Sequence, residues 1–284
     1  MLRPIIIDVL NHWFRTDIFT WIIPNYSITY AFAFIVVLSV YTIRSSKVSL
    51  NRFHAFWSGI WAIAFGLIGA RLYYLLLHPD AVIRSPSQIL IGGTGSVGGY
   101  ICGALGLILS LRIYQAPTLK YMDVAASSLG LGIFIGRIGC FLSGCCFGKI
   151  ANLPWAVRFP KGSLPYIAHL SEGLISSAAN LSLPIHPVQL YASLNGLLLF
   201  MITSWFRSHL QEHPGATFLL FWLMFCVTRF ILEYFRGDKI RGSIGPLSTP
   251  QFLCLLFTPL LISGLLWTMK ITQGNNNVWK ESWY

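Results

Sequence analysis

The stretch GRIGCFLSGCCFG, residues 136–148, contains an arginine, three cysteines and four glycines directly after an apolar run. Residues 124–135, which lead into it, are apolar or small throughout, so the pattern predicts a membrane helix with Arg137 inside or at the edge of the hydrocarbon. An arginine at that depth costs roughly 2.5 to 3.5 kcal/mol on insertion scales. Such a residue is expected to face an anionic partner or a water-filled cavity, because guanidinium suits phosphate and carboxylate. The alternative is a helix-end arginine that reaches the membrane surface.

The composition of the whole chain is typical of an integral membrane protein. Of its 284 residues, 55% are hydrophobic and only 10% are charged, which is too apolar for an ordinary soluble domain. The formal net charge of +11 would suggest a nucleic-acid partner in a soluble protein. Here most basic residues lie between apolar spans, so we expect them to meet anionic lipid headgroups and predict no nucleic-acid partner.

Seven segments are long and apolar enough to cross a bilayer as helices, which takes about 20 residues each. We therefore predict an all-α membrane protein with about seven transmembrane helices, at residues 24–43, 53–77, 97–116, 122–142, 187–206, 215–235 and 248–269. An odd number of spans puts the two termini on opposite sides of the membrane. The basic residues of the short loops slightly favour a cytoplasmic carboxyl terminus.

The segments outside the spans belong to the same single membrane domain, residues 1–284. Residues 1–20 are predicted to form an amphipathic segment on the membrane surface. Residues 143–186 are too many for a tight turn and too polar to span, so we expect a small extramembrane cap over the site. Residues 271–284 form a C-terminal tail.

The six cysteines show no paired spacing that would predict a disulfide framework. Three of them lie in apolar segments, where cysteine behaves as a small hydrophobic residue: Cys102, Cys226 and Cys254. The others are Cys140, Cys145 and Cys146, of which the last two are adjacent and therefore poor chelators. We predict no metal site and no cofactor.

Arginines inside three different spans suggest a binding site for an anion. These are Arg71, Arg137 and Arg229. Exposing each charged side chain to lipid costs free energy, and most of that cost is removed if the three surround one anion. The expected anion within a bilayer is a lipid phosphate, so we predict a headgroup pocket. Arg229, Glu233 and Arg236 are spaced to lie on one helix face, where an internal salt bridge is the structural alternative to a site.

Two further motifs have both a structural and a functional interpretation. Glycines at 95, 99 and 103 recur on one helix face and permit close helix packing, while Gly92 and Gly93 could expose amides to an anion. The sequence HPVQLY, residues 186–191, opens the fifth span and brings Gln189 and Tyr191 to the membrane interface. Tyr191 is there either as part of the aromatic belt or as a site residue.

The order of motifs resembles that of the bacterial prolipoprotein diacylglyceryl transferase family, from about Ile5 to Lys270. The matching residues are Tyr26, Tyr30, Gly69-Ala70-Arg71, the paired glycines of 92–99, Gly136-Arg137-Ile138-Gly139 with Phe141, Gly144 and Gly148, Trp155 to Pro160, His186 to Tyr191, and Arg229-Phe230 with Glu233 to Arg236. Several motifs in one order are far more specific than any one of them.

The resemblance implies transfer of a diacylglyceryl group from phosphatidylglycerol to a prolipoprotein lipobox cysteine, with release of glycerol 1-phosphate. It implies that Arg137 and Arg229 bind the phosphate, that Tyr26 and Glu233 position the lipid, and that Gly148 shapes the site. The remaining residues predicted to bind substrate are Arg71, Gly98, Gly99, His186, Gln189, Tyr191 and Arg236. A bacterial inner-membrane location is also implied, with the amino terminus outside and the carboxyl terminus in the cytoplasm.

The sequence departs from the family pattern at three chemically important positions. Val97 stands where the family has a histidine, Cys140 where it has an asparagine, and Cys145 where it has a glutamate. Three interpretations remain open. In the first, the chain is a divergent transferase in which Glu233, His186 or a cysteine acts as base. In the second, it uses a different protein or small thiol acceptor with Cys140, Cys145 or Cys146 as nucleophile. In the third, it is a lipid-binding or redox membrane component without transferase activity, whose three cysteines bind metal or form a disulfide.

Overall fold

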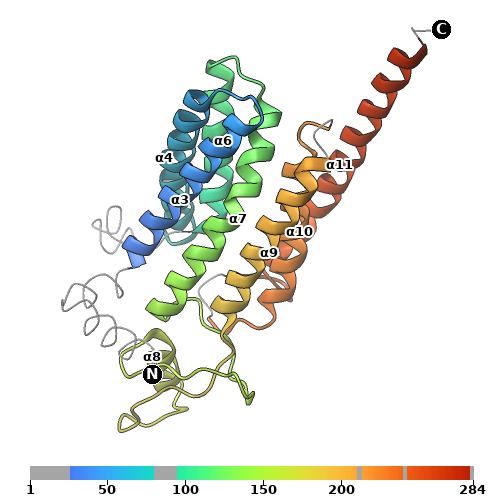
Figure 1. Cartoon of the computed structure of the whole chain (residues 1–284). Helices are drawn as coiled ribbons and strands as arrows, with labels where there is room; N and C mark the ends of the chain where they lie inside the picture. Colours follow the sequence, from blue (N-terminus) through green and yellow to red (C-terminus); the bar gives the residue numbers. More distant parts are fainter. Residues whose placement is uncertain (1–25, 80–94, 210–212, 239–241, 282–284) are drawn as a thin grey trace. The chain divides into compact units, whose positions relative to one another are not determined.

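The computed structural model describes residues 26–79, 95–209, 213–238 and 242–281, without the side chains of residues 26, 27, 243 and 271–281. The described part of the chain contains seven helices long and apolar enough to cross a membrane (Figure 1). They are α3 (Tyr26–Lys47), α4 (Arg52–Leu77), α6 (Ser96–Ile113), α7 (Thr118–Ser143), α9 (Val188–His209), α10 (Ala216–Glu233) and α11 (Thr249–Glu281). This confirms the predicted all-α membrane fold. The predicted surface segment 1–20 lies outside the described residues.

Helix ends follow the sequence closely, with one difference at the carboxyl end. The seven predicted spans correspond to the seven helices with ends shifted by a few residues. Helix α11 continues to Glu281, beyond its apolar part Thr249–Lys270, so most of the predicted tail 271–284 is helical.

The chain divides into two compact units, of which one comprises residues 37–125. Within it α4 and α6 pack against each other through glycines. A Cβ on Gly69 would lie 2.5 Å from the carbonyl oxygen of Gly98, and one on Gly103 would lie 3.2 Å from that of Ala62. The absence of side chains lets the two backbones approach closely. The predicted packing role of this glycine face is thereby confirmed.

The other unit comprises residues 1–36 and 126–284 and contains the second part of α7 with α9, α10 and α11. Its apolar core includes Ile133 of α7, Leu199 of α9 and Phe221 of α10. Gly130 and Gly196 permit α7 and α9 to approach, because a Cβ on Gly130 would lie 2.8 Å from the carbonyl oxygen of Gly196. The faces that remain apolar and exposed along these helices suit contact with lipid.

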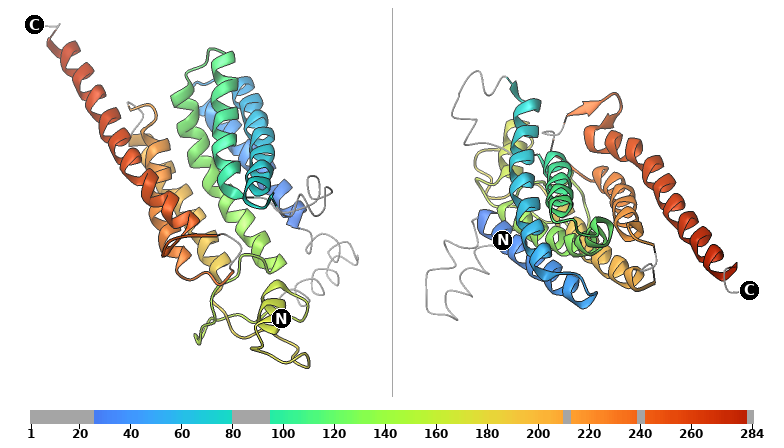
Figure 2. Two further views of the ribbon diagram at one scale, coloured as in Figure 1. Left: turned by 180° about the vertical axis from the view of Figure 1, so that it is seen from behind. Right: turned by 90° about the horizontal axis from the view of Figure 1, so that it is seen from above.

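The segment between α7 and α9 folds beyond the carboxyl end of α7 and the amino end of α9, as Figure 1 and Figure 2 show. It contains the short helix α8 (Leu164–Ser171), which Ser163 caps by accepting a hydrogen bond from the amide of Tyr166. Phe147, Phe159 and Ile185 form a small apolar core of its own. The segment thus has packing of its own, and its role as an extramembrane cap stays a prediction.

Helix α11 begins at a tight ribbon and a capping box. Strands β1 (Ser243–Ile244) and β2 (Leu247–Ser248) pair in antiparallel fashion. The Ser248 hydroxyl accepts from the amide of Gln251 at 3.3 Å, and the Gln251 side chain accepts from the amide of Ser248 at 3.1 Å. These two reciprocal bonds satisfy amides that the first helical turn leaves without partners.

Candidate active site

Helix α7 ends in a turn that brings its last cysteines back toward the helix. Gly144 adopts φ +71°, a left-handed conformation that glycine tolerates without strain. The amide of Gly144 donates to the carbonyl oxygen of Phe141 at 3.2 Å, and the amide of Cys145 donates to the carbonyl oxygen of Cys140 at 3.1 Å. This pair of bonds is a Schellman motif. It fixes the backbone of Cys145 against the last turn of α7.

Three thiols meet at this turn. The Sγ atoms of Cys140, Cys145 and Cys146 all lie within 4.8 Å of one another. Cys146 has φ +56°, which is uncommon for a residue with a side chain, and this conformation lets two adjacent cysteines converge. Cys140 is buried and lies 3.7 Å from the hydroxyl of Tyr30, while Cys145 and Cys146 are partly exposed. The cluster therefore has one closed side and one open side.

The two loop cysteines differ in how readily they ionise. Hydrogen bonds from Cys140 and Cys145 lower the pKa of Cys146 well below its ordinary value, helped by the positive charges of Arg137 and Arg236 and opposed by burial. The pKa of Cys145 is raised, because its hydrogen bonds with Cys140 and Cys146 and its burial favour the protonated thiol. The cluster thus favours a thiolate at Cys146.

A short backbone ladder joins the segment after α7 to the segment after α10. Gly148 and Arg236 form an antiparallel backbone bridge. On either side of it, the amide of Lys149 donates to the carbonyl oxygen of Phe235 at 2.8 Å, and the amide of Gly237 donates to the carbonyl oxygen of Phe147 at 3.0 Å. A Cβ on Gly148 would overlap the carbonyl oxygen of His186. Gly148 is therefore required for close backbone approach, and its role in shaping a substrate site stays a prediction.

Aromatic side chains from three segments gather beside this ladder. The Trp155 indole donates to the hydroxyl of Tyr191 at 2.7 Å, and Nδ1 of His186 lies 3.4 Å from the same hydroxyl. The ring of Phe235 stacks edge to face against both His186 and Tyr191, with centroid distances of 5.2 and 6.3 Å. Tyr191 is thus held in an aromatic and polar cluster next to the ladder.

Gln189 connects α9 directly to the cysteine turn. Its Nε2 donates to the carbonyl oxygen of Cys145 at 2.8 Å. The residue is only 1% exposed, and no described residue hydrogen-bonds to its Oε1. A buried amide oxygen without a partner is uncommon and costly, and a bound water is the usual way in which such an atom is satisfied.

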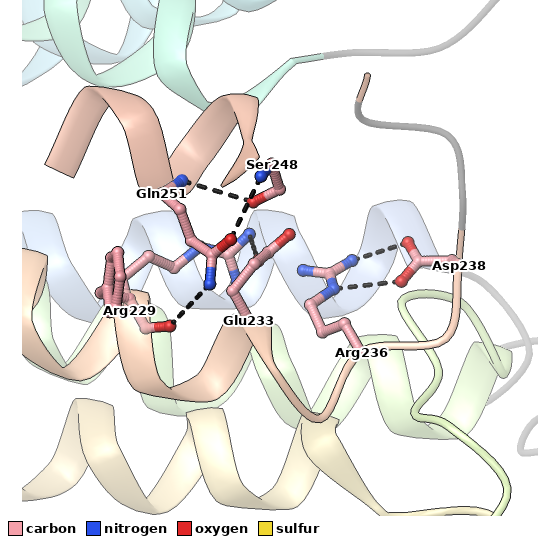
Figure 3. A network of polar contacts seen from close by, with 7 residues as sticks. Arg229, Glu233, Arg236, Asp238, Ser248 and Gln251 are labelled. Atoms are coloured by element: carbon pink, nitrogen blue, oxygen red, sulfur yellow. Dashed lines mark hydrogen bonds and ion pairs between the residues drawn. The ribbon is translucent and has the colours of Figure 1, made fainter. Parts of the chain in front are cut away.

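Two ion pairs lie at the carboxyl end of α10 (Figure 3). Nη2 of Arg229 lies 2.9 Å from Oε2 of Glu233 one helical turn later, with 13% and 3% of the two side chains exposed. Arg236 forms a fork to Asp238, with Nε to Oδ1 at 3.1 Å and Nη2 to Oδ2 at 2.7 Å. The predicted single helix face is wrong for Arg236, because α10 ends at Glu233 and Arg236 lies on the following turn.

Arg137 and Arg236 share one electrostatic environment with the cysteines. Burial and the positive charge of Arg137 lower the pKa of Arg236. The charge of Cys146 raises it, as do the hydrogen bond and the charge of Asp238, so that the pKa of Arg236 is raised overall. Arg137 and Arg236 also both favour ionised Cys146. These mutual effects require the three side chains to be near one another. The end of α7 and the turn after α10 therefore form one positively charged region.

Gln251 ties the beginning of α11 to this end of α10. Its Nε2 donates to the carbonyl oxygen of Phe230 at 3.4 Å, in addition to its part in the capping box (Figure 3). Phe230 lies between Arg229 and Glu233 on α10. The three contacts together hold the ion-paired turn in place.

Four predicted site residues are not placed relative to the described cluster. Arg71, Gly98 and Gly99 belong to the unit of residues 37–125, where the guanidinium of Arg71 lies 5.6 Å from the ring centroid of Tyr74. Gly98 and Gly99 contact α4, which gives both a packing role. The side chain of Tyr26 lies outside the described residues. The predicted meeting of Arg71 with the other arginines stays a prediction.

Sequence reasoning missed two contributors to the site, Asp238 and Gln251. Asp238 follows Arg236 by two residues, and that spacing alone does not predict a fork-shaped pair. Gln251 could have been found, because Ser248 to Gln251 matches the pattern of a capping box. Its contact with Phe230 depends on the way α10 and α11 pack.

Comparison with known proteins gives one consistent family. A family model described as prolipoprotein diacylglyceryl transferase matches residues 16–268. A phosphatidylglycerol–prolipoprotein diacylglyceryl transferase of Idiomarina loihiensis is 34% identical over 278 residues, 93% of this chain and 92% of the relative. That of Clostridium tetani is 34% identical over 214 residues, covering 75% and 80% of the two chains. That of Thermus thermophilus is 31% identical, covering 75% and 82%. The chain belongs to the prolipoprotein diacylglyceryl transferase family.

Proposed function

We propose that this chain transfers the diacylglyceryl group of phosphatidylglycerol to the cysteine thiol of a prolipoprotein. The observation that supports this most is the family match over residues 16–268, together with relatives whose names state this reaction and which match most of their own length. The chain is a multi-pass membrane protein, and a lipid donor reaches such a site from within the bilayer.

Arginine side chains are well suited to bind the phosphate of the lipid donor. We assign Arg137 and Arg229 to the phosphate, with Glu233 fixing the position of Arg229 through their 2.9 Å ion pair. Arg137, Arg229 and Arg236 bring three guanidinium groups to this end of the helices, and guanidinium suits a phosphate. Tyr26, His186, Gln189 and Tyr191 are assigned to the walls of the site, and Arg71, Gly98 and Gly99 are retained as predicted contacts of the lipid.

The reaction is a displacement at carbon. The acceptor thiol loses its proton. The thiolate sulfur then attacks the methylene carbon that joins the diacylglyceryl group to the phosphate. A carbon–sulfur bond forms while the carbon–oxygen bond to the phosphate breaks, and the electron pair leaves with glycerol 1-phosphate. Negative charge grows on the leaving phosphate during this step. Guanidinium groups already in position stabilise that charge without reorganisation, an effect worth roughly 3 to 4 kcal/mol per lost donor in other sites.

The position of the site relative to the membrane follows from the same assignment. We place the amino terminus and the segment 143–186 outside the cell and the carboxyl terminus in the cytoplasm, as the loop charges favour. The cap would then face the side on which an exported prolipoprotein arrives. Cleavage of an engineered protease site after Gly173, an exposed position on that segment, should occur in intact spheroplasts, and cleavage at residue 276 only after lysis.

A direct assay tests the function. The purified full-length chain in phosphatidylglycerol nanodiscs should convert a lipobox peptide to its diacylglyceryl thioether, detected by intact mass. Arg229→Lys should reduce the rate strongly, while the exposed Arg52→Lys on α4 serves as the matched control. Nanodiscs of phosphatidylcholine alone should give no product. Failure of the unmodified chain to form thioether in phosphatidylglycerol would refute the assignment.

A further inference from the structure

The cysteine turn has the donor set of a metal site. Three Sγ atoms from one short segment lie within 4.8 Å of one another. Zinc–thiolate bonds of about 2.3 Å in a tetrahedron place sulfur atoms about 3.8 Å apart. The largest sulfur separation therefore exceeds that of a zinc site by at most about 1 Å. The backbone turn that brings the sulfur atoms this close is already formed.

We propose that Cys140, Cys145 and Cys146 bind one Zn²⁺ and that the fourth coordination position takes the thiol of the acceptor. The first half of this proposal stands on the cysteine geometry alone. The second half rests on the proposed transferase function, because it assigns the metal to the acceptor of that reaction. Zinc sites with three protein ligands and an open fourth position are catalytic, whereas closed four-ligand sites are structural.

Three protein ligands leave one position of a tetrahedral site free, and the three cysteines differ in their exposure. Cys140 is 1% exposed and lies against Tyr30 of α3, whereas Cys145 and Cys146 are partly exposed. The buried Oε1 of Gln189, held beside Cys145 by the 2.8 Å bond from its own Nε2, has no hydrogen-bond partner among the described residues. A bound water would satisfy this acceptor.

The surrounding charges suit an anionic complex. One Zn²⁺ with three thiolates carries a charge of −1, and a fourth thiolate makes it −2. Arg137 and Arg236 both lie close enough to Cys146 to act on it electrostatically, and the charge of Arg236 is balanced by Asp238. The positive region thus stabilises the loaded complex and keeps the thiolate close to the proposed phosphate-binding arginines.

A zinc-bound acceptor provides the thiolate without a histidine base. On coordination the acceptor thiol releases its proton to solvent, because a coordinating thiol is deprotonated by the ion. Its sulfur then attacks the methylene carbon, the carbon–oxygen bond to the phosphate breaks, and glycerol 1-phosphate leaves with the electron pair. The product is a neutral thioether, a weaker zinc ligand than a thiolate, so it can dissociate. No electron is gained or lost by the metal.

Metal binding can be measured without lipid or acceptor. The full-length chain in detergent is stripped with chelator under reducing conditions and titrated with Co²⁺, which gives a thiolate charge-transfer band, and its zinc content after reloading is measured by mass spectrometry. We expect one metal per chain, loss of the band in Cys145→Ser and in Cys146→Ser, and retention in Cys102→Ser on α6. A band that is absent from the unmodified chain, or that survives in both loop variants, overturns the site.

Activity then tests the second half separately. The stripped chain in phosphatidylglycerol nanodiscs should lose thioether formation and regain it with Zn²⁺, and a lipobox peptide should shift the Co²⁺ spectrum while its Cys→Ser analogue should not. Full activity of the stripped chain overturns the role of the metal and leaves the transferase function intact. A metal-loaded chain that never forms thioether refutes the transferase function, while the lipid-free titration still decides the metal site.

Discussion

Nη2 of Arg229 lies 2.9 Å from Oε2 of Glu233 across one turn of α10, and both side chains are largely buried. Removing one partner of such a buried pair leaves an uncompensated charge and costs about 3 to 5 kcal/mol. A lysine at position 229 keeps the charge but loses the planar fork that matches a phosphate. We therefore expect Arg229→Lys to lower the transfer rate by about 100-fold, in the range found for lost charge-stabilising donors.

The paired variant separates positioning from charge. Glu233→Gln keeps the shape of the side chain and a hydrogen bond to Arg229 but removes the negative charge. It should raise the KM for phosphatidylglycerol more than it lowers kcat, because Arg229 keeps its charge but is held less firmly. Steady-state rates at several lipid mole fractions measure this. Equal effects of both variants on kcat alone would argue against a positioning role for Glu233.

Gly148 offers a second test, at the ladder between the segments after α7 and α10. A methyl group there would overlap the carbonyl oxygen of His186, and overpacking of this kind costs typically about 1 to 3 kcal/mol. Gly148→Ala should separate Phe147 and Gly237 and abolish transfer while the chain still inserts in the membrane. Gly264→Ala on α11 is the matched control, since its methyl would lie 3.4 Å from the end of Leu219. Equal activity of the two variants would contradict this role.

The segment between α7 and α9 should lose stability in mild acid. Burial lowers the pKa of His169 below its ordinary 6.5, while Glu172 acts in the opposite direction, and Nδ1 of His169 accepts from the amide of Leu183 at 3.2 Å. Protonation removes that acceptor. Because the unfolded segment binds the proton more readily, the contribution of this histidine to stability is complete above about pH 6.5. It is lost as the pH falls toward the folded pKa.

Hydrogen exchange of the α8 amides between pH 7.5 and 5 measures this effect after correction for intrinsic rates. Protection should fall with pH in the unmodified chain. In His169→Asn, whose amide oxygen can replace Nδ1 as acceptor without titrating, protection should be flat over this range. The same acid-dependent loss in both proteins would assign it to another group.

The capping box of α11 predicts a smaller and purely structural effect. Ser248→Ala removes the acceptor for the amide of Gln251 and should destabilise the start of α11 by about 1 kcal/mol. Thermal unfolding in nanodiscs measures it. Ser263→Ala, which removes an exposed hydroxyl bonded within the helix to Leu260, should change the midpoint little. A larger loss at Ser263 would contradict the capping argument.

The spans could be predicted from sequence because each depends only on the length and apolar character of one segment. The Arg229–Glu233 pair could also be predicted, because residues four apart on one helix lie on the same face. Arg236 could not, because its position depends on the residue at which α10 ends. The convergence of Cys145 with Cys146 depends on one backbone angle, φ +56° at Cys146, and no spacing rule for adjacent cysteines contains that angle.

The contacts between segments were also beyond the sequence. Gln189 reaches the carbonyl of Cys145 because the start of α9 packs against the turn after α7. Gly148 pairs with Arg236 because the segments after α7 and α10 lie side by side. The resemblance to a family supplied the identity of these residues as a group. It did not supply their contacts, which follow from packing.

The position of bond cleavage tests the proposed chemistry most directly. Phosphatidylglycerol labelled with ¹⁸O at the oxygen between the diacylglyceryl carbon and phosphorus is incubated with the chain and a lipobox peptide, and both products are weighed by mass spectrometry. Attack of the thiolate on carbon predicts that all ¹⁸O leaves with glycerol phosphate and none enters the thioether peptide. An unmodified peptide, or ¹⁸O retained on free diacylglycerol, would contradict the proposed transfer.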